Sequence, residues 1–205
     1  MTKTCEHRSC NEPRRGLSRY CSFHEGRQQR YGHPDGYYLK KRYYEGELEE
    51  AKAFIERHLE HEAIKAAVSW FDQWLSDAAL GQRVSGQREF RNLFDHGVTG
   101  RQCLEAVMGV WLYSFRRPSA LPHDLQFDFA LALAVLSLAP REKISSWTNG
   151  EPRERSRFVG FRSRRDVGRR IRVTLFSLAR NIRAKLDHEL NRLDSMQIVL
   201  ATSFQ

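Results

Sequence analysis

Three cysteines and a histidine lie close together near the amino terminus, at spacings that favour metal binding. Cys5, Cys10, Cys21 and His24 form the pattern C-x4-C-x10-C-x2-H. Such a pattern suits a tetrahedral ion, because each close pair supplies two ligands from one turn and the intervening loop brings the pairs together. Three thiolates with one imidazole predict a single structural Zn²⁺ that leaves no coordination position open for chemistry.

Other readings of this cluster stay open at the level of sequence. His7 and His33 compete with His24 as the fourth ligand, and we favour His24 because Cys21 and His24 have the two-residue spacing of a zinc knuckle. Free thiols or a disulfide are the alternatives to a metal, and a reducing compartment disfavours the disulfide. Cys103 stands apart near the start of an expected helix, and we predict that it is a small buried residue.

Metal binding would also explain how the first 36 residues fold. This stretch contains few large apolar side chains. Such a short segment cannot build a sufficient hydrophobic core, so metal binding must supply much of its folding free energy.

The residues around the cluster resemble a known segment. The matching runs are Cys10-Asn-Glu-Pro, Arg15-Gly-Leu, Tyr20-Cys-Ser-Phe-His24 and Arg27-Gln-Gln-Arg30-Tyr-Gly-His-Pro34. Together they resemble the small zinc-binding segment that precedes the nuclease domain in phage HNH endonucleases and related mobile-element proteins. The resemblance covers residues 1–36. It implies that Cys5, Cys10, Cys21 and His24 are ligands and that the basic residues after them face DNA.

The resemblance ends with the zinc segment. An HNH nuclease has a ββα-metal fold with paired histidines and an asparagine around a divalent ion, and the downstream sequence offers no such cluster. It also contains no phosphate-binding loop of the Walker type and no nucleophile elbow. We therefore predict that the protein is not an enzyme, and a nuclease with a noncanonical site is the second alternative.

Basic residues are concentrated at the two ends of the chain. The formal net charge is +9. Residues 1–44 carry ten Lys and Arg against four Asp and Glu, and residues 151–185 carry twelve against three. This distribution favours a polyanionic partner, because a local basic surplus attracts phosphates.

Arginines with nearby tyrosines suit nucleic acid, because arginine pairs with phosphates and guanine edges while tyrosine stacks on bases. On the last expected helix, Arg165, Arg169 and Arg172 share one face at spacings of four and three residues. The predicted nucleic-acid contacts are Arg14, Arg15, Arg19, Arg27, Arg30, Lys40, Lys41, Arg42, Arg162, Arg164, Arg165, Arg169 and Arg172.

An acidic stretch offers a competing explanation for these arginines. Residues 45–62 hold seven Glu against Lys52 and Arg57. If this stretch pairs with the arginines of the last helix, the basic face is neutralised within the protein. The alternative function is then a protein-interaction adaptor with a purely structural zinc site.

The periodicity of apolar residues predicts a mainly α-helical protein. We expect a small zinc-binding basic module in residues 1–44 and an α-helical domain of about five helices in residues 45–205. The first expected helices are one long helix over residues 47–79, with or without a kink, and a short helix over 89–94. A third helix should start at a capping box at Thr99, and a central core helix should cover 124–138. The last helix should start at a capping box over 163–166. Residues 141–161 are expected to form a surface loop.

The last helix should bury one apolar face. Its members are Ile171, Leu175, Leu178, Ile182, Leu186, Leu190 and Leu193. These residues recur at the spacing of one helical face, and the other faces are rich in arginine.

The functional expectation combines these features. We expect a zinc-stabilised nucleic-acid-binding protein of phage or mobile-element type that acts as a regulator or as an accessory subunit of a nucleoprotein complex. DNA is preferred over RNA because of the resemblance. The amino terminus lacks the apolar run of a signal peptide, and residues 129–139 form an apolar run too short to cross a bilayer. We therefore expect a cytoplasmic protein, in a bacterial cell or a phage-infected host, without membrane contact and without a small-molecule substrate.

Overall fold

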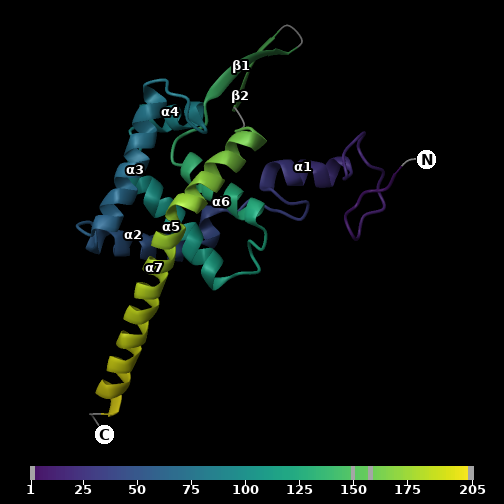
Figure 1. Cartoon of the computed structure of the whole chain (residues 1–205). Helices are drawn as coiled ribbons and strands as arrows, with labels where there is room; N and C mark the ends of the chain where they lie inside the picture. Colours follow the sequence, from purple (N-terminus) through teal and green to yellow (C-terminus); the bar gives the residue numbers. More distant parts are fainter. Residues whose placement is uncertain (1–2, 149–150, 157–158, 203–205) are drawn as a thin grey trace.

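The structure is a computed structural model that describes residues 3–148, 151–156 and 159–202; the side chains of residues 144, 146–156 and 189–202 are outside this description. Within these ranges the chain is mainly α-helical, as the sequence predicts (Figure 1). The elements, in chain order, are α1 Ser22–Tyr31, the short 3-10 helix η1 Lys41–Tyr43, α2 Glu45–Arg57, α3 Glu62–Ala79, α4 Gln87–Asp95, α5 Gly100–Arg116, α6 Asp124–Leu136, β1 Lys143–Thr148, β2 Glu151–Ser156 and α7 Phe161–Thr202.

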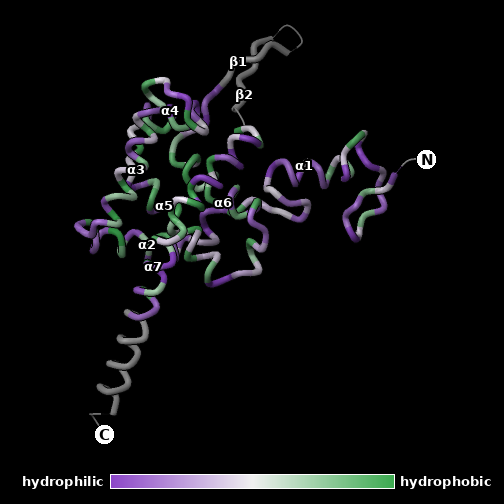
Figure 2. Tube along the Cα trace, in the orientation of Figure 1, coloured by the Kyte–Doolittle hydropathy of each residue, from purple (hydrophilic) through white to green (hydrophobic). Residues whose placement is uncertain are grey.

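Helix α5 is the centre of the body. It begins at the predicted capping box, in which the Thr99 side chain accepts from the Gln102 N–H and the Gln102 side chain accepts from the Thr99 N–H. All residues from 103 to 113 are buried, and α2, α3, α6 and α7 lie around the helix. Figure 2 shows the hydrophobic residues gathered where these helices meet. Helix α6, expected to be the central element, is therefore one of the neighbours of α5.

The single helix expected over residues 47–79 is wrong, because the chain turns between α2 and α3. Helix α2 ends at Arg57, and His61 precedes α3 as its N-cap. The imidazole Nδ1 of His61 accepts a hydrogen bond of 3.2 Å from the Ala63 N–H. The first N–H groups of a helix have no partner within the helix, and this bond satisfies one of them. His61 therefore acts as the N-cap of α3.

Residues 141–161 do not form the expected loop. Strands β1 and β2 pair as an antiparallel hairpin in which Lys143 is opposite Ser156 and Thr148 is opposite Glu151 (Figure 1). The two strands lack the alternation of apolar and polar residues that predicts a strand from sequence. The dipeptide Asn149-Gly150 between them is the sequence feature that predicts a hairpin turn.

Helix α7 begins earlier than expected. The carbonyl of Gly160 accepts from the Arg164 N–H at 3.1 Å, so the helix starts at Phe161. Ser163 and Asp166 lie inside its first two turns, and the prediction of a capping box there is wrong.

Helix α7 packs on α6 and also contacts α5 and α3. The side chains of Ile171, Leu175, Ile182 and Leu186 are buried, and Leu178 is half-buried. The side chains of Leu190 and Leu193 lie outside the described residues. No helix in the part of the chain that the structure describes has both the length and the apolar character needed to cross a membrane.

Helices α6 and α7 cross in close contact at Gly168. A Cβ atom on Gly168 would lie 1.8 Å from the carbonyl oxygen of Asp128 on α6. Only a residue without a side chain allows the two backbones to approach this closely.

Replacing Gly168 by alanine should therefore destabilise the protein by about 1–3 kcal/mol, because the two helices must separate. Gly46 in α2 is the matched control, since a Cβ there would meet nothing within 4 Å. The Gly46→Ala variant should keep or slightly raise the stability, because alanine favours the helix by about 0.5–1 kcal/mol. Urea unfolding of both variants tests this contact, and equal stability of the two would contradict it.

One buried ion pair also joins α6 to α7. The Asp128 carboxylate is buried, and the Arg172 guanidinium donates to it through Nε at 2.5 Å and contacts Asp124 at 3.1 Å. Burial raises the pKa of Asp128, and Arg172 opposes that shift. Arg172 thus favours the charged form of this buried carboxylate.

Replacing Arg172 by methionine should cost about 3–5 kcal/mol, because it leaves the Asp128 charge buried without a partner. Burial already raises the folded-state pKa of Asp128 above its unfolded value, and loss of Arg172 raises it further, so this cost is fully present at high pH and is lost as the pH falls and Asp128 is protonated. Urea unfolding at about pH 8 and about pH 5.5 should show the larger loss at the higher pH.

The double variant Asp128→Asn, Arg172→Met removes both charges and should recover much of the lost stability. A loss that is equal at both pH values, and that the double variant does not reduce, would show that Arg172 acts through its size alone.

Candidate metal centre

Two loops position the first two cysteines. The Cys5 N–H donates to the Glu12 carbonyl at 2.8 Å, which holds the first strand-like segment against the returning chain. The Cys10 N–H donates to the His7 carbonyl at 3.0 Å and closes a tight turn. Cys5 and Cys10 therefore face the same space although four residues separate them.

The other two residues of the cluster come from the start of α1. Cys21 is the N-cap of the helix, with an extended backbone at φ −67° and ψ 168°, and His24 follows within the first turn. A helix turn places residues three apart on one face, so both side chains point to the same side.

The four side chains form a group with the dimensions of a metal site. The three thiol sulfurs and one ring nitrogen of His24 lie within 4.8 Å of one another. His24 Nδ1 lies 3.3 Å from the Cys21 sulfur and 3.6 Å from the Cys5 sulfur, and the Cys10 and Cys21 sulfurs are 3.8 Å apart. Ligand bonds of ordinary length around a tetrahedral zinc would separate two sulfurs by about 3.8 Å and a sulfur from a nitrogen by about 3.5 Å. The cluster can hold a metal ion and is consistent with zinc.

The same distances argue against a disulfide. The separation of the Cys10 and Cys21 sulfurs is almost twice the length of an S–S bond, which is about 2.05 Å. All four cysteines are free thiols in this structure.

Burial prepares the histidine for ligation. Cys5, Cys21 and His24 are buried and Cys10 is half-buried. Burial lowers the pKa of His24, which favours the neutral imidazole that a metal requires. Four protein donors would complete the tetrahedral shell of a bound metal ion.

His7, the first competing ligand, lies behind His24. Its ring stacks on the His24 ring with centroids 4.0 Å apart, and its Nε2 lies 2.8 Å from a carboxylate oxygen of Asp35. The hydrogen bond with His7 lowers the pKa of Asp35. The sequence did not indicate this supporting contact, which ties the cluster to the turn that follows α1.

His33, the second competing ligand, takes part in joining the module to the body. Its ring stacks on that of His123, next to the start of α6, at a centroid distance of 3.9 Å. Gly32 ends α1 with a positive φ of 82°, and a Cβ there would lie 2.6 Å from the Leu125 carbonyl oxygen. The end of α1 thus lies directly against α6.

Arg164 of α7 completes this attachment. Its guanidinium donates to the carbonyl of Gln29 at 2.7 Å and to the carbonyl of Arg30, and it lies over the Phe129 ring at 5.0 Å. Carbonyls in the last turn of a helix have no partner within the helix, so Arg164 caps α1 from another element. Figure 1 shows α1 running outward from this contact to the loops that carry the cysteines.

Several predicted nucleic-acid contacts have partners inside the fold. Arg164 and Arg172 make the contacts described above. In the module, Arg14 contacts Glu6 at 2.7 Å, Arg15 contacts Glu25 at 3.8 Å, and Arg27 donates to the carbonyls of Asp35 and Gly36.

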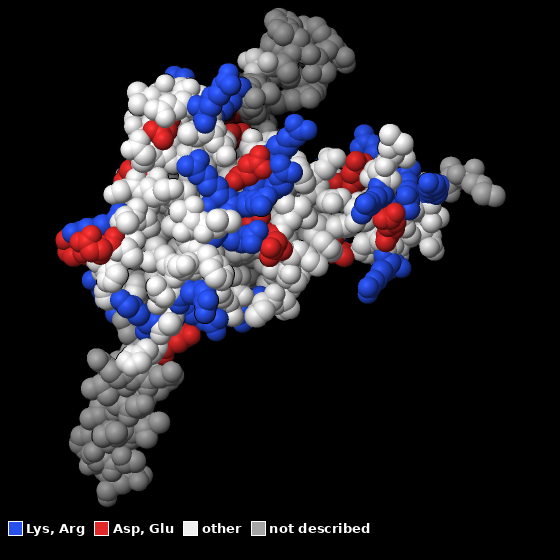
Figure 3. Space-filling view, viewed as in Figure 1, with Lys and Arg blue, Asp and Glu red and all other residues white. Residues whose placement is uncertain are grey.

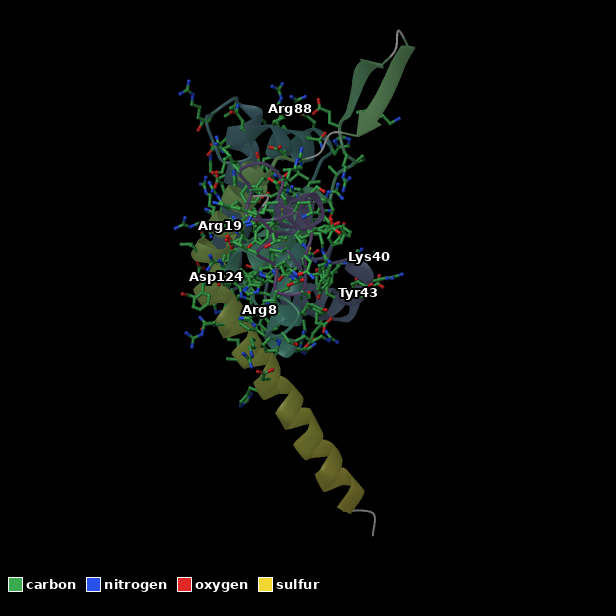
Figure 4. All side chains as sticks on the ribbon, turned by 90° about the vertical axis from the view of Figure 1, so that its right-hand side faces the viewer. Arg8, Arg19, Lys40, Tyr43, Arg88 and Asp124 are labelled. Carbon is green, nitrogen blue, oxygen red and sulfur yellow. The ribbon has the colours of Figure 1, made fainter. Side chains whose placement is uncertain are left out.

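Other predicted contacts are exposed. Arg165 pairs with its neighbour Asp166, and Arg42 donates to the Tyr43 hydroxyl. Among the described side chains, no ion pair is formed by Arg19, Arg30, Lys40, Lys41, Arg162 or Arg169. Figure 4 shows Arg19 and Lys40 on opposite sides of the view.

Comparison with known protein families, curated proteins and solved structures gives no match for the chain.

Cys103 is buried in α5, as predicted, and is far from ionisation. Its side chain is fully enclosed, and burial raises the pKa of its thiol to about 12. This cysteine offers a control for experiments on the metal cluster.

Purified protein should contain about one zinc per chain. Replacing Cys21 by serine should abolish zinc retention, whereas His24→Cys should preserve it because four thiolates also form a structural zinc site. Cys103→Ala should leave the zinc content unchanged. Elemental analysis after dialysis measures all four proteins, and zinc retained by Cys21→Ser would contradict the site.

Proposed function

We propose that the protein is a zinc-stabilised nucleic-acid-binding protein with DNA as its preferred partner. Cys5, Cys10, Cys21 and His24 would hold one zinc ion, which supplies folding free energy to the module. The preference for DNA follows from the resemblance of residues 1–36 to the zinc-binding segment of phage HNH endonucleases. The protein would act as a regulator or as an accessory subunit of a nucleoprotein complex.

The observation that supports nucleic-acid binding best is a row of exposed arginines on α7. Arg162, Arg165 and Arg169, which we call the arginine stripe, are exposed and follow one another at spacings of three and four residues. They lie on one face over two helical turns, about 10 Å along the axis. Figure 3 shows Lys and Arg side chains gathered over this first half of α7. Phosphates of one backbone can contact such a row together.

Ion pairs elsewhere in the body also support this proposal. Glu47 pairs with Arg117 at 2.6 Å, Glu50 pairs with Arg116 at 2.7 Å, and Glu56 pairs with Arg101. In the described part of the chain, these glutamates of the acidic stretch contact arginines of α5 and none of the arginine stripe. The acidic stretch is used to attach α2 to α5, and it leaves the stripe, in which Arg165 pairs with its neighbour Asp166, open to a partner.

A protein-interaction adaptor is the second candidate, because α7 also exposes apolar side chains. Val173 is 69% exposed and Phe176 is 48% exposed, three residues apart on the helix. Such a pair can contact a protein partner. Absence of nucleic-acid binding at low salt by zinc-loaded, folded protein would favour this function.

Replacing Arg162, Arg165 and Arg169 together by alanine should weaken binding to a DNA duplex and reduce the slope of log affinity against log salt by up to about 3. This triple variant is a better test than one that includes Arg172, because loss of Arg172 would destabilise the fold. Fluorescence anisotropy with a labelled duplex over a salt series measures both quantities.

A matched control removes the same charge elsewhere. Lys65, Arg83 and Arg91 are exposed residues of α3, the loop after it and α4. Their triple alanine variant should retain most of the affinity and the salt slope. Equal losses in the two triple variants would show that only net charge matters and would contradict the proposed surface.

A further inference from the structure

A groove lies where the zinc module meets the helical body. It has a volume of about 390 Å³ and is lined from the module side by Arg30, Tyr31, Tyr38 and Lys40 and from the body side by Leu133 and Arg164, among others. This volume is in the range of small-molecule sites, which is about 300–1,000 Å³. The groove exists only because α1 is attached to α6 and α7.

The groove is positively charged. None of the described residues that line it is an aspartate or a glutamate. Arg30 and Lys40 are exposed, and neither makes an ion pair with a described residue. The groove therefore attracts an anion and offers two flexible cations to hold it.

Arg164 adds a partly buried charge whose partners are incomplete. It donates to two carbonyls of α1, but none of its contacts with described residues is with a carboxylate, and its buried Nε has no acceptor. Desolvation lowers the pKa of this guanidinium. A buried cation without a counter-charge is costly, so an anion in the groove would be stabilised by it.

Two tyrosines and a leucine make the same groove suitable for a base. Tyr31 is half-buried, Tyr38 is 38% exposed, and Leu133 adds apolar surface. Aromatic side chains bind bases by stacking, with little dependence on which base is present. A base inside a duplex has both ring faces covered by its neighbours and must leave the stack before it can contact a tyrosine.

We infer that this groove binds one unpaired nucleotide of a nucleic-acid strand, with its base against Tyr38 and Tyr31 and its phosphate near Arg30 and Lys40. The inference rests on the proposed function and specifies the form of the nucleic acid. The nucleotide can come from a single strand or from an unpaired position in a duplex. Because Gly32 and Arg164 fix α1 against the body, the two walls are already in place before binding.

The test uses zinc-loaded, full-length protein and three DNA probes that carry the fluorescent base 2-aminopurine. The probes are a single strand of about 12 nucleotides, the blunt duplex of the same sequence, and that duplex with the 2-aminopurine left unpaired. Anisotropy measures affinity, and quenching of the 2-aminopurine emission reports stacking. The variants are Tyr38→Ala, its conservative control Tyr38→Phe, and Lys40→Gln.

Wild type should bind the single strand with quenched emission. Tyr38→Ala should lose the quenching and about tenfold in affinity, Tyr38→Phe should keep both, and Lys40→Gln should lose affinity but retain quenching. Binding of the blunt duplex should be the same in all four proteins. Quenching by the unpaired duplex as well as the single strand would identify both sources of the nucleotide.

Unchanged affinity and quenching in Tyr38→Ala and Lys40→Gln would overturn the groove while leaving duplex binding by the arginine stripe intact. Failure of wild type to bind any of the three probes at low salt would overturn the proposed function and the groove together. Zinc content and circular dichroism confirm that each variant is folded.

Discussion

The segment up to the end of α1 is arranged around four donor atoms that lie within 4.8 Å of one another. The segment before α1 has two loops, one tight turn and few apolar side chains, so the cluster is what fixes the loops to the start of the helix. The end of α1 is held differently, by Gly32 against α6 and by the Arg164 guanidinium. The cluster at one end and the body at the other thus hold one short helix, and any surface shared by module and body depends on both.

Arginines near the start of α7 differ in the direction in which they face. Arg164 and Arg172 complete the fold, since one caps α1 and the other neutralises a buried carboxylate. The arginine stripe is exposed, and among the described residues it neither caps a helix nor neutralises a buried carboxylate. Basic composition alone cannot separate these groups, because a helix with one buried face can use the same residue type on its border and on its outer side.

The parts of the structure that sequence could predict are those fixed by local chemistry. Thr99 and Gln102 cap α5 with each other, and Cys21 and His24 are brought together by one helical turn, so both features are present in short segments. The parts that it could not predict depend on distant neighbours. The cap provided by Arg164 and the role of Arg172 are determined by α1 and α6, which lie far away in the sequence.

The most direct test of this account is hydrogen exchange of the zinc-loaded and the chelated protein, followed by mass spectrometry. If metal binding folds the module, removal of zinc should abolish the protection of amides in residues 3–31, including α1, while α5 keeps its protection. Unchanged protection of α1 in protein shown to be free of metal would contradict the account, because the module would then fold on the body without its metal centre.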